Sequence, residues 1–135
     1  MGSVKIDIQE KDRKYTQTYA LNTPKGVARL LRDRYRIAER RFKGDTAASD
    51  ILIDLSSAIE SAGLTQRQAE ALALVHGKWQ LTHQEAAKVM GVGRRSVTQF
   101  VNEVYGKLAA IYKRWNYGEI IVEYTETEGE RDIER

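Results

Sequence analysis

The sequence predicts a mainly α-helical fold: a helical bundle with a small β-sheet formed by an N-terminal hairpin and a C-terminal strand. Apolar residues recur at three- and four-residue spacing through the middle of the chain, which is typical of amphipathic helices. Residues 4–8 instead alternate apolar and polar side chains, as half-buried strands do, and residues 119–125 are again strand-like. The length of 135 residues suits one domain with a small appended element.

The two ends of the chain are expected to form the sheet. Residues 4–8, the charged stretch 10–14 and the Tyr- and Thr-rich stretch 15–21 together predict a hairpin. An isolated hairpin is only marginally stable in water, so the strand at 119–125 is expected to complete the sheet, within the chain or across a homodimer. The acidic end is expected to be disordered beyond about residue 128.

A pair of antiparallel helices is predicted next. Thr23 and Pro24 form a good helix start, and this helix is expected to run to residue 42. A second helix is expected over residues 46–61, with Gly63 as its stop. The apolar stripes of the two helices are Val27, Leu30, Leu31, Ile37 and Ala38, and Ile51, Leu52, Leu55 and Ile59.

Charge is segregated between these two helices. The first and its flanks carry a net charge of +6, and the second and its flanks carry −4. The arginines of the first helix therefore either pair with Asp50, Asp54 and Glu60 or contact phosphates, and both interpretations stay open.

Three further helices with tight connections are predicted over residues 64–117. Thr65 with Gln68, and Thr82 with Glu85, have the spacing of capping boxes, so helices are expected to start at both places. Gly77 is expected to end the first of them. The second ends at Met90, and Gly91 then takes the left-handed conformation of a tight turn. The last helix is expected to run from Arg94 to about Trp115.

This arrangement predicts a helix-turn-helix, a structure that places the start of its second helix in the major groove of DNA. The expected packing residues are Ala86, Ala87, Val89, Met90, Val92, Val97, Phe100, Val101, Val104 and Leu108. The expected base contacts are Arg94, Arg95, Thr98, Gln99 and Asn102, which are residue types that pair with base edges. The expected phosphate contacts are Thr82, Lys88, Lys113 and Arg114.

Residues 64–108 resemble region 4 of the sigma-70 class of bacterial transcription factors. The resemblance rests on Leu64-Thr65-Gln66-Arg67-Gln68, Leu72-Ala73-Leu74, Thr82-His83-Gln84-Glu85-Ala86-Ala87, and Gly91-Val92-Gly93-Arg94-Arg95-Ser96-Val97-Thr98-Gln99. It implies that the last helix reads bases with Arg94, Arg95, Thr98 and Gln99. That family often has a basic residue where this chain has Thr98, so its hexamer preference is not carried over. The helix before this region resembles those of small phage and prophage sigma-like regulators of late genes.

The chain is accordingly expected to be a cytoplasmic, DNA-binding transcriptional regulator encoded by a phage or prophage, with RNA polymerase as a further expected partner. Two alternatives stay open: a DNA-packaging recognition subunit similar to small terminases, and a sigma-like adaptor that binds RNA polymerase. No catalytic residues, metal, cofactor or membrane contact are expected. The sequence contains no cysteine, two histidines and no catalytic motif.

Four stretches of the chain are expected to differ in role. They are the hairpin (1–22), the helical pair (23–63), the helix-turn-helix domain (64–117), and the terminal strand with its acidic tail (118–135). His76 and His83 are expected to be hydrogen-bonded or exposed rather than catalytic. The aromatic residues Trp79, Trp115 and Tyr117 are expected to pack between the helical unit and the sheet.

Overall fold

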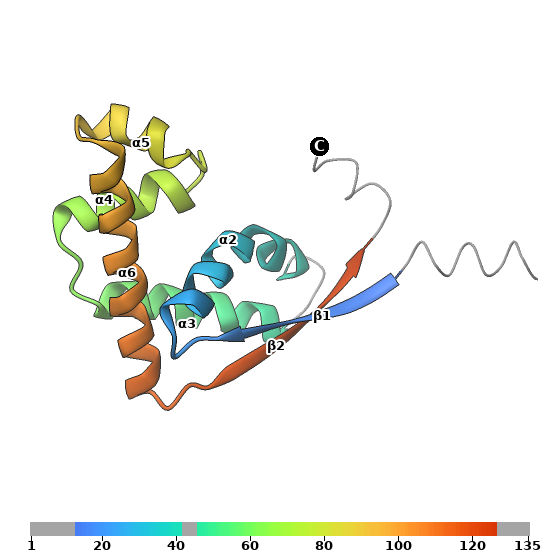
Figure 1. The fold of residues 1–135 in the computed structure, drawn as a ribbon. Helices are drawn as coiled ribbons and strands as arrows, with labels where there is room; N and C mark the ends of the chain where they lie inside the picture. Colours follow the sequence, from blue (N-terminus) through green and yellow to red (C-terminus); the bar gives the residue numbers. More distant parts are fainter. Residues whose placement is uncertain (1–12, 42–45, 127–135) are drawn as a thin grey trace, which may run out of the picture. The chain divides into compact units, whose positions relative to one another are not determined.

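The structure, a computed structural model, describes residues 13–41 and 46–126. It confirms the predicted fold class, because it is mainly helical with a small antiparallel two-stranded sheet. The elements are β1 (Arg13–Ala20), α2 (Pro24–Arg41), α3 (Thr46–Ser61), α4 (Gln66–His76), α5 (His83–Met90), α6 (Arg94–Arg114) and β2 (Glu119–Glu126), as Figure 1 shows. The predicted strand at 4–8, the hairpin it would form and the tail beyond residue 128 lie outside the described residues.

The chain divides into two compact units. One comprises residues 20–119 and contains all the described helices, so the predicted helical pair and the three helices after it belong to the same unit. The described part of the other unit is formed by strands from both ends of the chain. The sheet thus pairs β1 with β2 within one chain, which is one of the two arrangements that the sequence left open.

The sheet has a buried and an exposed face. Tyr19, Val122 and Tyr124 are buried, and the hydroxyls of Tyr19 and Tyr124 lie 2.6 Å apart in a hydrogen bond between the strands. The exposed residues are Thr16, Thr18, Glu119, Ile121 and Glu123. This alternation follows from the two-residue period of a strand, which sends neighbouring side chains to opposite faces.

The start of α2 is held by a side-chain cap. The Thr23 hydroxyl accepts a hydrogen bond from the Gly26 backbone N–H (3.1 Å) and donates one to the Ala20 carbonyl (2.8 Å). The chain passes so close to itself here that a Cβ atom on Gly26 would lie 2.0 Å from the Ala20 oxygen. Glycine is therefore required at this position by the approach of the two backbones.

The long helix α6 packs against α2, α3, α4 and α5. Its buried side chains include Val104, Leu108, Ile111 and Tyr112. The stripes predicted for the helical pair also face inward, since Val27, Leu30, Leu31, Ile37 and Leu55 are buried. Figure 1 shows α4 and α5 beside one half of α6, and this arrangement leaves the start of α6 at the α5 end of the unit.

The segment after α6 is fixed to α3 by a polar contact. The Tyr117 hydroxyl donates a hydrogen bond to the Asp54 carboxylate. Burial, with that carboxylate adding to it, raises the pKa of Tyr117 to about 12. Tyr117 and Trp115 also contact the ring of Tyr112, with ring centroids 5.0 and 5.7 Å apart. Asp54, one of the residues considered as an arginine partner, thus binds a tyrosine.

His76 and Tyr105 join α4 to α6. The Nε2 atom of His76 lies 2.6 Å from the Tyr105 hydroxyl, and the two rings meet edge to face. Burial lowers the pKa of His76 from 6.5 to about 4, and Arg34 and His83 act in the same direction. The imidazole is therefore neutral at pH 7, and it shares one hydrogen bond with the Tyr105 hydroxyl. The expectation that His76 is hydrogen-bonded or exposed is confirmed by this contact.

Two glycine substitutions are expected to change stability in opposite directions. Gly26→Ala should lower the free energy of unfolding by about 2 kcal/mol, because its Cβ atom collides with backbone. Gly106→Ala should raise it by about 0.5–1 kcal/mol, because this position is inside α6 and open space surrounds the added methyl group. Urea denaturation of both variants measures the two changes. Equal effects of the two substitutions would contradict the described packing.

Acid is expected to destabilise the fold through His76. Between about pH 6.5 and 4 the unfolded chain binds a proton at His76, whereas the folded chain does not. The free energy of unfolding therefore decreases as the pH is lowered through this range. The loss from this group should reach roughly 2–3 kcal/mol at pH 4.5. Urea denaturation at pH 7 and pH 4.5 should therefore show a smaller loss for His76→Gln than for the wild type. A loss of the same size in both proteins would show that His76 is not the group responsible.

Candidate nucleic-acid interface

The two predicted capping boxes are present. At α5, the Thr82 hydroxyl accepts from the Glu85 backbone N–H (3.1 Å) while the Glu85 carboxylate accepts from the Thr82 backbone N–H (2.9 Å). Thr65 and Gln68 make the same reciprocal pair at α4, at 3.2 and 3.0 Å. These bonds satisfy N–H groups that a helix start leaves without partners, so both helices begin where the sequence predicts.

The turn between α5 and α6 has the predicted left-handed glycine. Gly91 has φ 71° and ψ 33°, and its N–H bonds to the Ala87 carbonyl. The guanidinium of Arg67 donates to the Met90 carbonyl at 3.2 Å, so α4 satisfies one carbonyl at the end of α5. Gly93 occupies the N-cap of α6 with extended backbone and no side-chain cap.

Small apolar side chains hold α5 against α6. Ala86, Ala87 and Met90 are buried with Val97 and Val101 in one cluster. Because alanine side chains are short, they allow the two helices to approach closely. The packing predicted for the helix-turn-helix is confirmed at these five positions.

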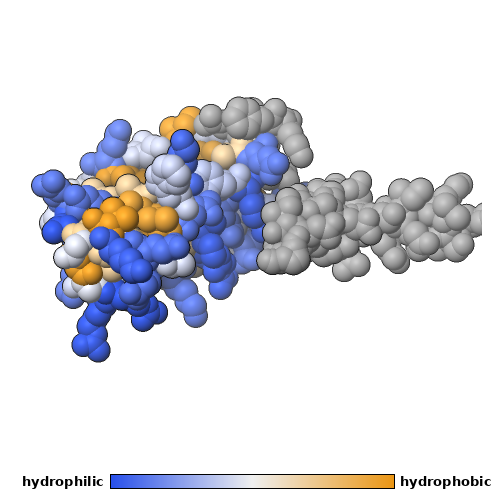
Figure 2. Space-filling model, turned by 90° about the horizontal axis from the view of Figure 1, so that it is seen from above, coloured by the Kyte–Doolittle hydropathy of each residue, from blue (hydrophilic) through white to orange (hydrophobic). Residues whose placement is uncertain are grey.

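Val89 is a correction to that prediction. Its side chain is 66% exposed, so it does not pack in the core as the sequence analysis expected. On a helix of eight residues, Ala86, Ala87 and Met90 already cover the inward face, and Val89 falls outside it. Figure 2 shows apolar surface bordered by hydrophilic side chains at this end of the helical unit.

The first turns of α6 carry a set of exposed polar side chains. Arg94, Arg95, Gln99 and Asn102 are exposed, and they follow the helix at three- and four-residue spacing. Within the described residues, the side chains of Arg94, Arg95 and Asn102 make no hydrogen bond or ion pair, so their donors are available to a ligand. The structure brings these predicted base-contacting residues together on one side of the helix.

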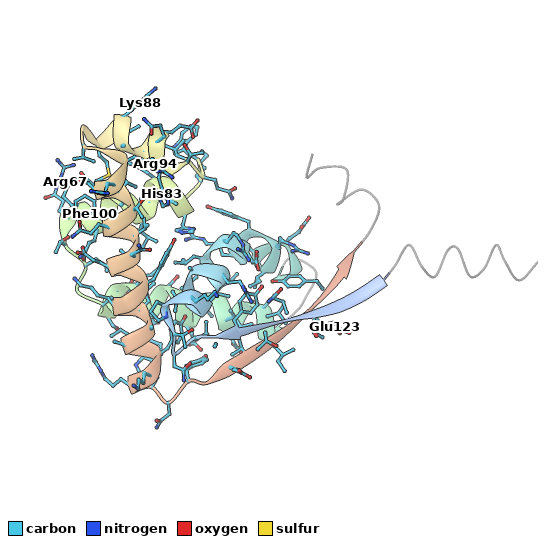
Figure 3. The ribbon with its side chains drawn as sticks, in the orientation of Figure 1. Arg67, His83, Lys88, Arg94, Phe100 and Glu123 are labelled. Atoms are coloured by element: carbon cyan, nitrogen blue, oxygen red, sulfur yellow. The ribbon has the colours of Figure 1, made fainter. Side chains whose placement is uncertain are left out.

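Thr98, the fifth predicted base contact, is placed differently. It is only half exposed, and its hydroxyl lies 2.8 Å from Nδ1 of His83 and 3.3 Å from the Arg94 carbonyl. His83 is the first residue of α5, and Figure 3 shows it at the same end of the unit as Arg94 and Lys88. The expectation that His83 is hydrogen-bonded or exposed is confirmed, but its partner was not predicted.

Gln99 is oriented by Glu103. Its amide donates to one carboxylate oxygen of Glu103 at 3.2 Å, and the amide of the buried Gln68 donates to the other at 2.9 Å. These two hydrogen bonds, with Gln68 first, lower the pKa of Glu103 below its ordinary value. Sequence reasoning did not select Glu103, although its four-residue distance from Gln99 was a signal for this contact.

The predicted phosphate-contacting residues fall into two groups. Thr82, the N-cap of α5, and Lys88, within that helix, are both exposed beside the start of α6. Lys113 and Arg114 are also exposed, but they lie in the last turn of α6, about 30 Å along the helix from Arg94. The structure therefore does not bring Lys113 and Arg114 together with the other candidates.

Trp79 is a second correction. It is 71% exposed in the connection between α4 and α5, with the Lys78 ammonium 5.5 Å from its ring centroid, so it is not a packing residue. Trp115 is 39% exposed, whereas Tyr117 is half-buried and bound to Asp54 within the helical unit. The predicted packing of these aromatic residues is therefore wrong for Trp79.

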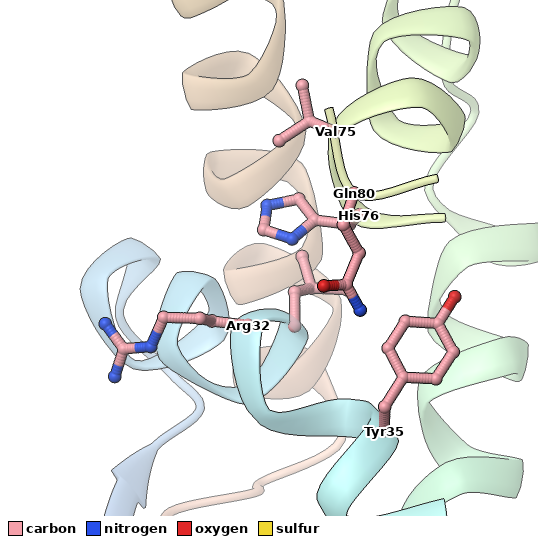
Figure 4. Close-up of a pocket in the computed structure, with 6 residues that line it drawn as sticks. Arg32, Tyr35, Val75, His76 and Gln80 are labelled. Atoms are coloured by element: carbon pink, nitrogen blue, oxygen red, sulfur yellow. The ribbon is translucent and has the colours of Figure 1, made fainter. Parts of the chain in front are cut away.

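A cavity of about 250 Å³ lies between α2 and α4 (Figure 4). It is lined by Leu31, Arg32, Tyr35, Val75, His76 and Gln80. The Arg32 side chain extends away from His76 and Tyr35, and the neutral His76 is already bound to Tyr105. The cavity is therefore poorly suited to hold an anion, since it has no cationic group directed into it.

Residues 13–41 and 46–126 give no support to two other classes of site, a metal centre and a membrane span. In this part of the chain no group of three or more His, Asp or Glu side chains could hold a metal ion. No helix there is both long enough and apolar enough to cross a membrane. The polar surface at the start of α6 is accordingly the candidate site with the clearest structural definition.

Comparisons with known proteins were made for the whole chain. They found no matching family model, no similar curated protein and no similar solved structure.

The turn between α5 and α6 makes a prediction about stability. Gly91→Ala should lower the free energy of unfolding by about 1–2 kcal/mol, because a side chain is strained at its positive φ. Gly93→Ser should raise it by roughly 0.3 kcal/mol, since the extended N-cap has space for a capping hydroxyl. Thermal and urea unfolding of the two variants test this, and a neutral Gly91→Ala would contradict the left-handed turn.

Proposed function

We propose that the chain is a sequence-specific, double-stranded-DNA-binding transcriptional regulator encoded by a phage or prophage. The observation that carries this proposal is the set of exposed side chains without partners at the start of α6, directly after a tight turn from α5. Such exposed side chains add nothing to the packing of the core. In a recognition helix, by contrast, side chains without internal partners can form hydrogen bonds with bases. In helix-turn-helix proteins the start of the second helix enters the major groove.

The residue types support reading of bases. Arg94 and Arg95 offer the paired donors that match the O6 and N7 acceptors of guanine, and Asn102 and Gln99 match the edge of adenine. Each good contact of this kind discriminates against a wrong base by about 1–3 kcal/mol. Glu103 holds the Gln99 amide on one side, which reduces the number of directions in which Gln99 can bond.

Contacts to phosphate are assigned to α5. Lys88 supplies a positive charge, and the exposed Thr82 hydroxyl, which accepts from the Glu85 N–H, can donate its own hydrogen to a phosphate oxygen. The stretch 65–117 carries a net charge of +5, which supports attraction to a polyanion that is independent of sequence. Lys113 and Arg114 are left out of this contact because of their distance along α6.

The transcriptional role rests on the resemblance of residues 64–108 to sigma-70 region 4. The capping boxes, the left-handed glycine and the packing of α5 on α6 are consistent with that resemblance. RNA polymerase is the further partner that it implies. The origin in a phage or prophage likewise rests on the resemblance alone.

Selection of duplexes from a random pool, at a stated salt concentration, tests the proposal. The wild type should enrich a motif, and Arg94→Ala should weaken binding to it by about 1–3 kcal/mol and relax the preference at a single base pair. Arg114→Ala is the matched control, because it removes the same charge from the other end of the same helix. It should leave the sequence preference unchanged. Absence of any enriched motif with the wild type would refute specific DNA binding.

A further inference from the structure

We propose that His83 is a further base-reading residue, which accepts a hydrogen bond from the exocyclic amino group of adenine or cytosine, and that Thr98 positions it. This inference rests on the proposed DNA binding, and it adds that His83 reads one base position of the DNA target. It also changes the role of Thr98 from a base contact to a positioning residue.

The bonds of the Thr98 hydroxyl determine which nitrogen of His83 carries the proton. This hydroxyl donates to the Arg94 carbonyl at 3.3 Å and lies 2.8 Å from Nδ1 of His83. A hydroxyl has a single hydrogen, so both bonds can form together only if Nδ1 of His83 is the donor in the second. In the neutral tautomer that satisfies both bonds, the proton is on Nδ1 and Nε2 carries a lone pair.

The Nε2 atom is available to a ligand. His83 is half exposed, and its described side-chain hydrogen bond is the one through Nδ1. An atom with a lone pair and no hydrogen cannot bond to a phosphate oxygen, which is also an acceptor. Among the groups in the major groove, the N6 amino group of adenine and the N4 amino group of cytosine are donors. The lone pair of Nε2 therefore matches an amino group and not the DNA backbone.

His83 is also correctly placed for this contact. Its partner Thr98 lies one turn after Arg94 and one turn before Asn102 on α6. The imidazole therefore adjoins the middle of the exposed polar surface, although it belongs to α5. A contact from this position would read a base beside those that α6 reads.

The preference expected from an acceptor has a distinctive form. At one position of one strand, adenine and cytosine present an amino group, whereas thymine and guanine present a carbonyl oxygen at the corresponding place. His83 should accept both amino-bearing bases and reject both carbonyl-bearing bases. This two-base preference differs from that of an arginine, which pairs with guanine alone and would give a preference for one base.

The tautomer is tested without DNA. Long-range ¹H–¹⁵N correlation spectra of the labelled full chain above pH 7 report which ring nitrogen is protonated. Wild type and Thr98→Ser should show His83 protonated at Nδ1, and Thr98→Val should lose this fixed state because it lacks the hydroxyl. Protonation at Nε2 in the wild type would overturn the inference, whatever the chain binds.

The base preference is tested by selection of duplexes with four proteins: wild type, His83→Ala, Thr98→Val and Thr98→Ser. His83→Ala and Thr98→Val should both lose the amino-base preference at the same position, by about 5- to 150-fold in discrimination. Thr98→Ser should keep it. The inference is wrong if His83→Ala retains every base preference, or if it weakens binding equally on all sequences. If Arg94→Ala still relaxes the preference at its own base pair in that case, the proposed DNA binding stands although the inference fails. If the wild type enriches nothing, the proposed function and this inference both fail.

Discussion

The amide of Gln68 fixes the position of α4 against α6, and much of the helix-turn-helix depends on it. It is a buried polar side chain, and its oxygen accepts from the Thr65 N–H at 3.0 Å and the Lys107 ammonium at 2.7 Å, while its nitrogen donates to Glu103. An amide in the core is costly unless these bonds are made, so only one relative placement of the two helices satisfies them. The same network extends through Glu103 to Gln99 on the exposed surface.

This network explains how α6 combines two roles. Its buried side chains, from Val97 to Tyr112, form a continuous inward face that contacts every other helix of the unit. Its outward face changes along its length, from unpartnered Arg and Asn side chains at the start to Lys107, which bonds to the Gly63 carbonyl and to Gln68. The core thus holds the helix in place, while the exposed side chains of Arg94, Arg95 and Asn102 in its first turns keep no internal partner. A surface that binds a groove benefits from this, because little side-chain pairing must be broken on binding.

The sequence predicted those features that depend on neighbouring residues. The capping boxes, the left-handed Gly91 and the inward stripe of α6 are local patterns, and the structure has all of them. Contacts between helices could not be predicted in this way. The bond of His83 to Thr98 spans 15 residues and that of Gln68 to Glu103 spans 35, and neither spacing is encoded in a helical period. Trp79 was misjudged for a related reason, since its aromatic type favours burial whereas its place in a short connection exposes it.

The pairing of the two end strands has a consequence for the order of folding. Tyr19 and Tyr124 bond across 105 residues of sequence, and closing so long a loop in an unfolded chain is entropically unfavourable. The helical unit removes this barrier, because the Leu21 N–H bonds to the Gly118 carbonyl at 3.2 Å and thereby joins the two ends of the unit. Helices with local contacts form quickly, so the sheet closes last. During synthesis β2 also leaves the ribosome after β1 and after every helix of the unit, so β1 waits without its partner until the whole helical unit has been translated.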